Sequence, residues 1–396
     1  MKKKNESDGL NCEQSMNPQS SAMQKPNVFV NRERLQQEFA ELTGIDSVSF
    51  SERQMADQLK KRLLELGFTV LEDQAGKHYG GNAGNVYGYR KGTLPGSGVL
   101  LSAHMDTVQP GIGKKAIFSE DGTITSQGDT ILGADDVTGI VEILEGIRCV
   151  QEAGLPHRDV EVLFPIAEEV YIKGTTVFDF SQIRAREAYV LDLSGPIGTA
   201  ALQAPTLISF TVTVTGKAAH AGFSPEDGIH AVQIMCYAVG EIPQGHVDEE
   251  TTLNIGLISG GEATNIVPPS CTCKGEIRSY SHEKALAALE KVRRQFQQIA
   301  EAGGAKFHLE SSVDLMAYRV GEDALAVEHF KEACDRLGIS WNLTRTFGGS
   351  DNNNFLRHGI SGIVLSCGMY EVHSVREYTK MKDLECGARL VAELIQ

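Results

Sequence analysis

The chain has 396 residues, of which 41% are hydrophobic and 22% are charged, and its formal net charge at pH 7 is -15. This length exceeds that of one small core and predicts two domains. The net negative charge argues against nucleic-acid binding, and no apolar run approaches the roughly 20 residues that span a bilayer.

The N-terminal stretch "MKKKNESDGLNCEQSMNPQSSAMQKP" is polar throughout and has no apolar core of a secretory signal. We expect residues 1–26 to form a disordered tail and the protein to be cytoplasmic. The eight cysteines are scattered without a CxxC pair, which is typical of reduced thiols.

The segment "SERQMADQLKKRLLELGF" predicts a helix, with a capping box formed by Ser51 and Gln54. Helices then alternate with short apolar strands until about residue 200. The runs 98–103, 160–167 and 188–191 are almost continuously apolar, as in strands that are covered on both faces. This pattern predicts an α/β domain with a mixed, mostly parallel sheet and helices on both faces.

The pattern changes at residue 204, where alternating strands and two amphipathic helices follow one another in the order βαββαβ. That order is typical of a ferredoxin-like sandwich. After residue 316 the α/β pattern returns. We therefore predict that residues 204–316 form a smaller domain inserted between the two parts of the larger one, 27–203 and 317–396.

Acidic residues and histidines follow several predicted strands directly. Ligands of open α/β sheets bind beyond the carboxyl ends of the strands, so these side chains would meet at one edge. They are His104 and Asp106 after strand 98–103, Glu168 and Glu169 after 160–167, Asp192 after 188–191, His373 a short loop beyond 361–366, and Asp135 and Asp136 just before a helix.

Each group alone has a structural explanation. An Asp pair before a helix is usually an N-cap, a Glu pair is usually a solvated corner, and a single histidine such as His373 is more often structural than a ligand. Together, however, these carboxylates would repel one another at one sheet edge unless a cation held them. A metal site explains the whole set.

The number of ligands suits two tetrahedral metals. One bridging carboxylate, two histidines and two further carboxylates supply three protein ligands for each metal. Oxygen and nitrogen ligands without thiolate suit Zn²⁺, Co²⁺ or Mn²⁺. Asp106 and Glu168 then stay available to orient a ligand and to transfer protons.

The motifs "SAHMDTV", "LGADDVTG", "AEEVYIKG", "VLDLSG", "GKAAHAGFSPEDGIHA" and "FGGSDNNNF" resemble those of the dinuclear zinc peptidase family that contains peptidase T, the glutamate carboxypeptidases and the aminoacylases. The resemblance covers about residues 30–396. "LGADD" and Asp192 are most similar to the tripeptidase (peptidase T) branch. The two outer segments would be the catalytic domain, and the insertion would be a lid through which relatives dimerise.

This resemblance implies a role for each matching residue. His104 and Asp192 would bind one metal, Glu169 and His373 the other, and Asp135 would bridge the two. Asp106 would hydrogen-bond to His104 and fix its tautomer. Glu168 would be the general base that takes a proton from the bridging water and passes it to the leaving amine. In the family, the peptide bond corresponding to Asp135–Asp136 is cis.

In the lid, His220 matches the histidine that reaches the substrate carbonyl oxygen, from the partner subunit in dimeric relatives. Without the resemblance, it would be a turn histidine at a strand end. Asn265 and Arg278 match substrate-contacting positions, although Arg278 could equally form a plain surface salt bridge. Gly349 and Ser350 are expected to offer main-chain N–H groups to the substrate.

Two further patterns qualify the resemblance. Val137 stands where many relatives have Lys, and "GMYEVHSVREY" is less rich in histidine than in tripeptidase-type relatives, which affects the expected substrate preference. "PGIGKKA" fits a loose dinucleotide-binding pattern, but it leads into a predicted hairpin with a turn at Asp121–Gly122 instead of a helix, so we reject it.

The sequence therefore predicts a metal-dependent peptidase that removes the N-terminal residue of short peptides, with tripeptides as its expected substrates. One alternative is an N-acyl amino acid amidohydrolase or a carboxypeptidase with the same metals. Another is a catalytically silent binding protein, which loss of Glu168 or of a ligand would have favoured. Neither nucleic acid nor membrane is an expected partner, whereas a homodimer through the lid is.

Overall fold

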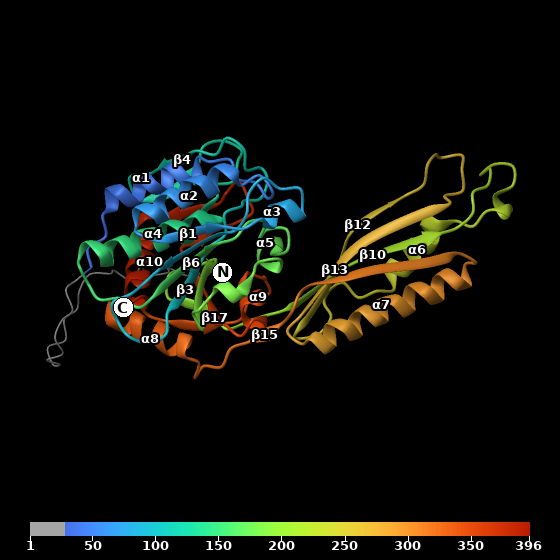
Figure 1. The fold of residues 1–396 in the computed structure, drawn as a ribbon. Helices are drawn as coiled ribbons and strands as arrows, with labels where there is room; N and C mark the ends of the chain where they lie inside the picture. Colours follow the sequence, from blue (N-terminus) through green and yellow to red (C-terminus); the bar gives the residue numbers. More distant parts are fainter. Residues whose placement is uncertain (1–27) are drawn as a thin grey trace, which may run out of the picture.

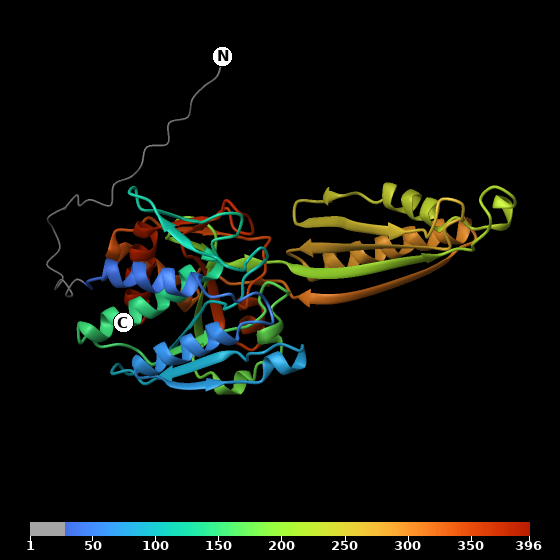
Figure 2. The ribbon, with the colours of Figure 1, turned by 90° about the horizontal axis from the view of Figure 1, so that it is seen from above.

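The computed structural model describes residues 28–396, which form two lobes joined at one end of the smaller lobe (Figures 1 and 2). The predicted tail, residues 1–26, lies outside the described residues. Each lobe has its own hydrophobic core, built in the smaller lobe from residues between 208 and 309.

The larger lobe contains an eight-stranded sheet in the order β1-β2-β6-β3-β7-β17-β8-β16. Its centre is parallel and consists of β6 (Val160–Phe164), β3 (Val99–Ser102), β7 (Glu187–Leu193) and β17 (Ser361–Ser366). Three of these strands correspond to the apolar runs of the sequence and β17 to the strand expected at 361–366, and the predicted mixed, mostly parallel sheet is confirmed. The outer strands are β1 (Thr69–Glu72), β2 (Val86–Arg90), β8 (Thr199–Ala201) and β16 (Asn342–Thr344).

The two faces of this sheet are covered unequally. One face packs against the long helices α1 (Arg32–Thr43), α2 (Arg53–Glu65), α4 (Ala134–Glu152), α8 (Leu325–Leu337) and α10 (Met381–Leu394). The other is covered mainly by residues 178–185 and the short helix α9 (Asn352–Arg357).

The beginning of α2 differs from the predicted capping box. Glu52 occupies the N-cap position, and no side chain caps the helix there. The Glu52 carboxylate instead accepts a hydrogen bond from the main-chain N–H of Phe50 at 2.7 Å. The capping-box prediction is therefore wrong, because the residue at the helix start turns its side chain toward the protein interior.

The smaller lobe is an antiparallel sheet in the order β11-β12-β13-β10-β14. Its helices lie on one face of the sheet, and the other face is open (Figure 2). This arrangement confirms the ferredoxin-like order, with β11 as an additional short strand. The elements are β10 (Thr206–Thr215), α6 (Ala231–Gly240), β11 (Gly245–His246), β12 (Thr251–Gly260), β13 (Ser270–Ser279), α7 (His282–Ala302) and β14 (Lys306–Leu315).

The predicted hairpin after the glycine-containing loop is present. It consists of β4 (Ala116–Phe118) and β5 (Thr123–Ser126), with Gly122 in the left-handed conformation at φ 84°. A strand and not a helix follows "PGIGKKA", so the loop lacks the helix N-terminus that would bind a dinucleotide.

A buried carboxyl group lies between α4 and α10. Glu142 is 1% exposed, and neither carboxylate oxygen has a hydrogen-bond partner among the described residues. The helices are too close for any side chain at Gly387, where a Cβ would lie 2.0 Å from the Glu142 carboxyl carbon. Burial raises the pKa of Glu142 well above its ordinary value of 4.5, and the charges of Asp136 and Asp383 add to this shift.

We expect Glu142→Met to stabilise the protein by roughly 1–3 kcal/mol, the cost of a buried polar group without a partner. Because the pKa is raised in the folded state, the native carboxyl is tolerated best below pH 4.5, and its cost grows as the pH rises toward the folded-state pKa. Urea unfolding at about pH 5 and about pH 8 should therefore show a larger gain at the higher pH. A gain that shrinks with rising pH would contradict this account.

Candidate metal centre

The end of β3 delivers His104 and Asp106 into the interior, and both are buried. The His104 Nδ1 atom lies 2.9 Å from the main-chain oxygen of Asp106 and 3.5 Å from its carboxylate. The tautomer with hydrogen on Nδ1 therefore donates to that main-chain oxygen, and Nε2 is left free to act as a ligand. The carboxylate itself accepts hydrogen bonds mainly from other groups.

Asp135 lies between the two histidines at the start of α4. Its Oδ1 is 3.1 Å from His104 Nε2, and its Oδ2 is 3.2 Å from His373 Nε2. Each carboxylate oxygen thus faces a different imidazole, which is the arrangement that a bridging ligand requires. The peptide bond between Asp135 and Asp136 is cis, which confirms the prediction from the family resemblance.

The two remaining predicted ligands, Asp192 and Glu169, each lie near one of the histidines. Asp192 Oδ1 is 3.9 Å from His104 Nε2, and Glu169 Oε2 is 3.0 Å from His373 Nε2. The ligand atoms of His104, Asp135 and Glu169 all lie within 4.8 Å of one another. The side chains of the five predicted ligands therefore lie close together, with Asp192 nearer His104 and Glu169 in contact with His373.

Asp136 is a further carboxylate near this cluster, and sequence reasoning gave it no role. Its ligand atom lies within 4.8 Å of those of His104 and Asp192. However, its Oδ2 already accepts the main-chain N–H of His104 at 3.0 Å. This bond fixes the turn that presents the imidazole, so we interpret Asp136 as a support for His104.

Glu377 was also missed. It is 1% exposed, and its carboxylate accepts the main-chain N–H groups of Gly133 at 2.7 Å and Asp135 at 3.0 Å. Glu377 lies four residues after His373, so it ties the loop of one histidine to the loop of the bridging aspartate. Its position four residues after the predicted ligand His373 was the only hint in the sequence. Its role as an acceptor could not be predicted, because its partners lie more than 240 residues away along the chain.

The site concentrates negative charge in the protein interior. Burial and the neighbouring carboxylates raise the pKa of Asp192 well above its ordinary range, and the charge of His104 opposes that shift. Hydrogen bonds to Asp135 and Glu169 raise the pKa of His373 to about 11. A proton is thus held where a cation would otherwise balance the charge, and a bound metal would displace it.

Glu168 is partly buried beside this cluster. Burial and the charge of Asp192 raise the pKa of its carboxyl group well above the ordinary value. The adjacent Glu169 points toward His373 instead, so the two neighbouring glutamates face different parts of the site. A carboxyl group with a raised pKa beside a candidate metal site has the chemistry of a proton-transfer group.

The predicted substrate-contacting residues of the smaller lobe, here called the lid, lie apart from the metal-site residues of the same chain. The loop between β10 and α6, which carries His220, is at the end of the lid farthest from the larger lobe (Figures 1 and 2). The His220 ring is exposed and stacks on Phe223, with ring centroids 4.2 Å apart. Asn265 lies beside it, and its main-chain oxygen accepts the N–H of Ala221 at 2.9 Å.

Arg278, at the base of the lid, is already paired. Its guanidinium binds both carboxylate oxygens of Glu276, at 2.8 and 3.2 Å, and donates to the main-chain oxygen of Phe347 at 2.8 Å. Of the two interpretations weighed from the sequence, the salt bridge is the one observed. In the neighbouring loop, the Ser350 N–H donates to the Asn353 side chain at 3.0 Å. This N–H group therefore already has a partner within the chain, and its role toward a substrate stays a prediction.

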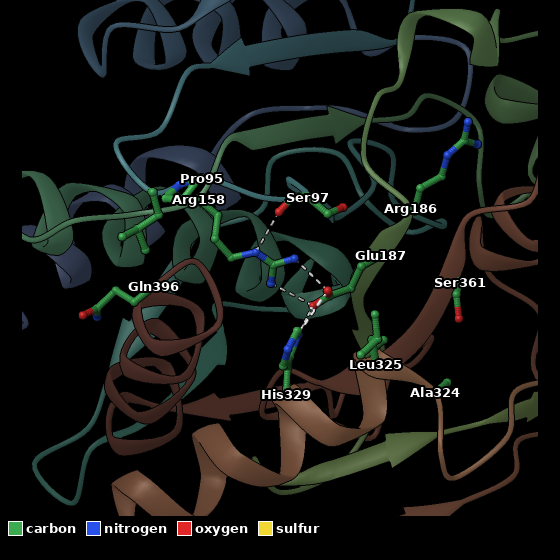
Figure 3. Close-up of a pocket in the computed structure, with 12 residues that line it drawn as sticks. Pro95, Ser97, Arg158, Arg186, Glu187, Ala324, Leu325, His329, Ser361 and Gln396 are labelled. Carbon is green, nitrogen blue, oxygen red and sulfur yellow. Dashed lines mark hydrogen bonds and ion pairs between the residues drawn. The ribbon is translucent and has the colours of Figure 1, made fainter. Parts of the chain in front are cut away.

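A cavity of about 490 Å³ lies at the opposite end of the sheet, where β6, β7 and β17 begin (Figure 3). Glu187 is central to it and accepts hydrogen bonds from Arg158 at 2.7 Å and His329 at 3.0 Å. None of the predicted site residues lines this cavity. We interpret the three side chains as a structural ion-pair network.

The cluster of two imidazoles and surrounding carboxylates at the strand ends of the larger lobe has the donor set of a metal-dependent hydrolase and is a candidate metal centre. Comparisons with known proteins agree with this class. Residues 204–304 match the sequence profile of the peptidase dimerisation domain, and residues 85–215 match that of peptidase family M28. None of the described helices has the length and hydropathy of a membrane span.

Three full-length relatives show the family. The protein YqjE of Bacillus subtilis is 35% identical over 368 residues, which cover 93% of this chain and 99% of that protein. The structure of aminopeptidase PepT from Bacillus cereus is 35% identical, with a TM-score of 0.85 and coverage of 92% and 98%. That of a Staphylococcus aureus tripeptidase is 32% identical, with a TM-score of 0.89 and the same coverage. The chain belongs to the peptidase T family, as its motifs predicted.

Proposed function

We propose that the protein is a dinuclear metal-dependent aminopeptidase that hydrolyses the N-terminal peptide bond of tripeptides. The observation that carries this proposal is the position of Asp135, with one carboxylate oxygen toward His104 and the other toward His373. The full-length similarity to an aminopeptidase and a tripeptidase supports the choice of reaction.

The residues present fit two divalent cations, most readily Zn²⁺, with Co²⁺ or Mn²⁺ as alternatives. His104 and Asp192 would hold one cation and Glu169 and His373 the other, with Asp135 shared between them. When bound, the cations would polarise the scissile carbonyl group and lower the pKa of the attacking water. The buried carboxylates supply the negative charge that such cations need.

Glu168 would act as the general base. It accepts a proton from the attacking water and donates that proton to the nitrogen of the departing amine, so the protons balance over the reaction. Its raised pKa suits both halves of this task, because a strongly acidic carboxyl group would not give the proton back efficiently. Asp106 holds the backbone of Glu168 and so helps to aim it, through a hydrogen bond of 2.9 Å.

We further propose that two copies of the chain associate through their lids and that His220 acts in the partner's site. The match to a peptidase dimerisation domain over residues 204–304 supports this assembly. Within one chain, the loop of His220 lies at the far end of the lid from the larger lobe (Figure 1). An imidazole N–H supplied by a partner would stabilise the oxyanion that forms at the substrate carbonyl.

The proposal is tested with trialanine, its N-acetylated form and its C-terminal amide, each incubated with protein reconstituted with Zn²⁺, Co²⁺ or Mn²⁺. Mass spectrometry should show cleavage after the first residue of the free peptide and of the amide, with the acetylated form spared. Release of acetate would instead indicate a deacylase, and release of the last residue a carboxypeptidase. No turnover with any metal would contradict the proposed reaction.

A further inference from the structure

Another buried glutamate, Glu52, lies close to the candidate metal centre but has no part in the chemistry proposed above. Glu52 is completely buried, and its Oε1 accepts two main-chain hydrogen bonds. One comes from Phe50 at 2.7 Å, and the other comes from Ala167 at 3.1 Å, across 115 residues of sequence. Ala167 immediately precedes Glu168 and Glu169, so Glu52 contacts the turn that carries both.

Asp106 holds the next two amides of the same turn. Its Oδ1 accepts the N–H of Glu168 at 2.9 Å, and its Oδ2 accepts that of Glu169 at 3.3 Å. The carboxylate is fixed in turn by the hydroxyl of Ser49 at 2.7 Å. Three consecutive amides of residues 167–169 therefore end on two buried carboxylates that are both attached to residues 49–52.

The backbone needs this support at the point where Glu52 acts. Ala167 has a φ of 52° and Phe50 a φ of 70°, and both lie in the left-handed region that residues other than glycine rarely adopt. A residue in this conformation costs about 1–2 kcal/mol, and it persists only where surrounding contacts hold it. Rotation at Ala167 would turn the chain that follows and redirect the side chains of Glu168 and Glu169.

We propose that Glu52 is a positioning residue, which holds Ala167 in its left-handed conformation and thereby aims Glu168 at the reacting water. This inference rests on the proposed function, because it gives Glu168 the role of general base. Glu52 acts as a hydrogen-bond acceptor whose side-chain length matters, since the single oxygen Oε1 receives both main-chain hydrogen bonds. Its negative charge is not required for this task.

The surroundings of Glu52 agree with an acceptor that can work without its charge. Burial, and then the charge of Asp106, raise the pKa of Glu52 to about 7. The other carboxylate oxygen, Oε2, has no hydrogen-bond partner among the described residues. An uncharged amide oxygen at the position of Oε1 could therefore receive the same two bonds.

Two substitutions of Glu52 distinguish the effect of its side-chain length from the effect of its charge. Glu52→Gln keeps the length of the side chain and its acceptor oxygen but removes the charge. Glu52→Asp keeps the charge but shortens the side chain by one methylene, so it cannot reach both amides. Glu161 provides a matched control, since it is also fully buried and its carboxylate accepts the main-chain N–H groups of Arg184 and Ala185 away from the metal centre.

The first measurement is hydrogen exchange of peptides that cover residues 167–169, in the metal-free protein. Exchange at the Ala167 amide should be roughly tenfold faster in Glu52→Asp, which corresponds to the loss of about one hydrogen bond, and close to wild type in Glu52→Gln. The control pair Glu161→Gln and Glu161→Asp should alter exchange only near residues 184–185. Unchanged protection of Ala167 in Glu52→Asp would overturn the proposal.

The second measurement is steady-state hydrolysis of the free tripeptide below the melting temperatures of all variants. Glu52→Asp should lower kcat about 10- to 100-fold with KM changed less than about threefold, whereas Glu52→Gln and both Glu161 variants should stay close to wild type. Equal losses in Glu52→Gln and Glu52→Asp would overturn the acceptor role. If the wild type hydrolyses no tripeptide, the proposed function fails, and hydrogen exchange alone still decides whether Glu52 holds the turn.

Discussion

Replacing Glu168 with Gln is expected to lower kcat by about 10²–10⁴-fold, the range that a general base contributes. The amide keeps the size of the side chain but cannot take up a proton from water. Since Glu168 is not among the five grouped ligands, the variant should still bind two metals and should bind a tripeptide with nearly unchanged affinity. Steady-state kinetics measure kcat, metal analysis measures the bound metal, and titration calorimetry measures the affinity for the peptide.

The neighbouring residue provides the control. Glu169 Oε2 lies 3.0 Å from His373 Nε2, so Glu169→Gln should reduce metal content as well as turnover. The two adjacent substitutions therefore separate proton transfer from metal binding. If Glu168→Gln retained more than about a tenth of the wild-type kcat, the general base would have to be another residue.

Removal of the shared ligand should have the other large effect. In Asp135→Ala both cations lose a ligand, so we expect tight binding of both metals to be lost. The kcat should fall more than about 100-fold, which exceeds the usual effect of replacing a residue that only orients a metal ligand. His373→Ala removes a ligand of one site only and should leave about one metal per chain. Inductively coupled plasma mass spectrometry after gel filtration gives these ratios.

A histidine outside the site shows whether the loss is specific. The His308 side chain is 69% exposed on the lid, and His308→Ala should keep the metal content of the wild type. One retained metal in Asp135→Ala together with loss of both in His373→Ala would contradict the assignment of Asp135 as the bridge.

The sequence predicted the parallel centre of the sheet and the proximity of the five side chains proposed as ligands. Both followed from one regularity, because polar residues directly after buried apolar strands must gather at the edge where parallel strands end. His104, Asp192 and Glu169 all lie at or just beyond such ends. No knowledge of side-chain geometry was needed for this step.

Hydrogen bonds from side chains to distant main-chain amides could not be predicted in the same way. Glu52 and Glu377 each accept two main-chain N–H bonds. The bonds from Ala167, Gly133 and Asp135 join residues more than 100 positions apart, so the local sequence does not show them as acceptors. In "SERQ", the local pattern indicated a capping box, whereas tertiary contacts turned Glu52 inward. Arg278 was ambiguous for a similar reason, since its partner Glu276 lies on the same strand and a substrate would compete with it.

The central claim is that two metals lie on either side of Asp135, and anomalous diffraction from crystals of the zinc-loaded protein tests it most directly. We predict two anomalous peaks at the zinc edge, one in contact with His104 and Asp192 and the other with Glu169 and His373, with one oxygen of Asp135 toward each. A single peak, or a peak that contacts Asp136 in place of Asp135, would contradict the account.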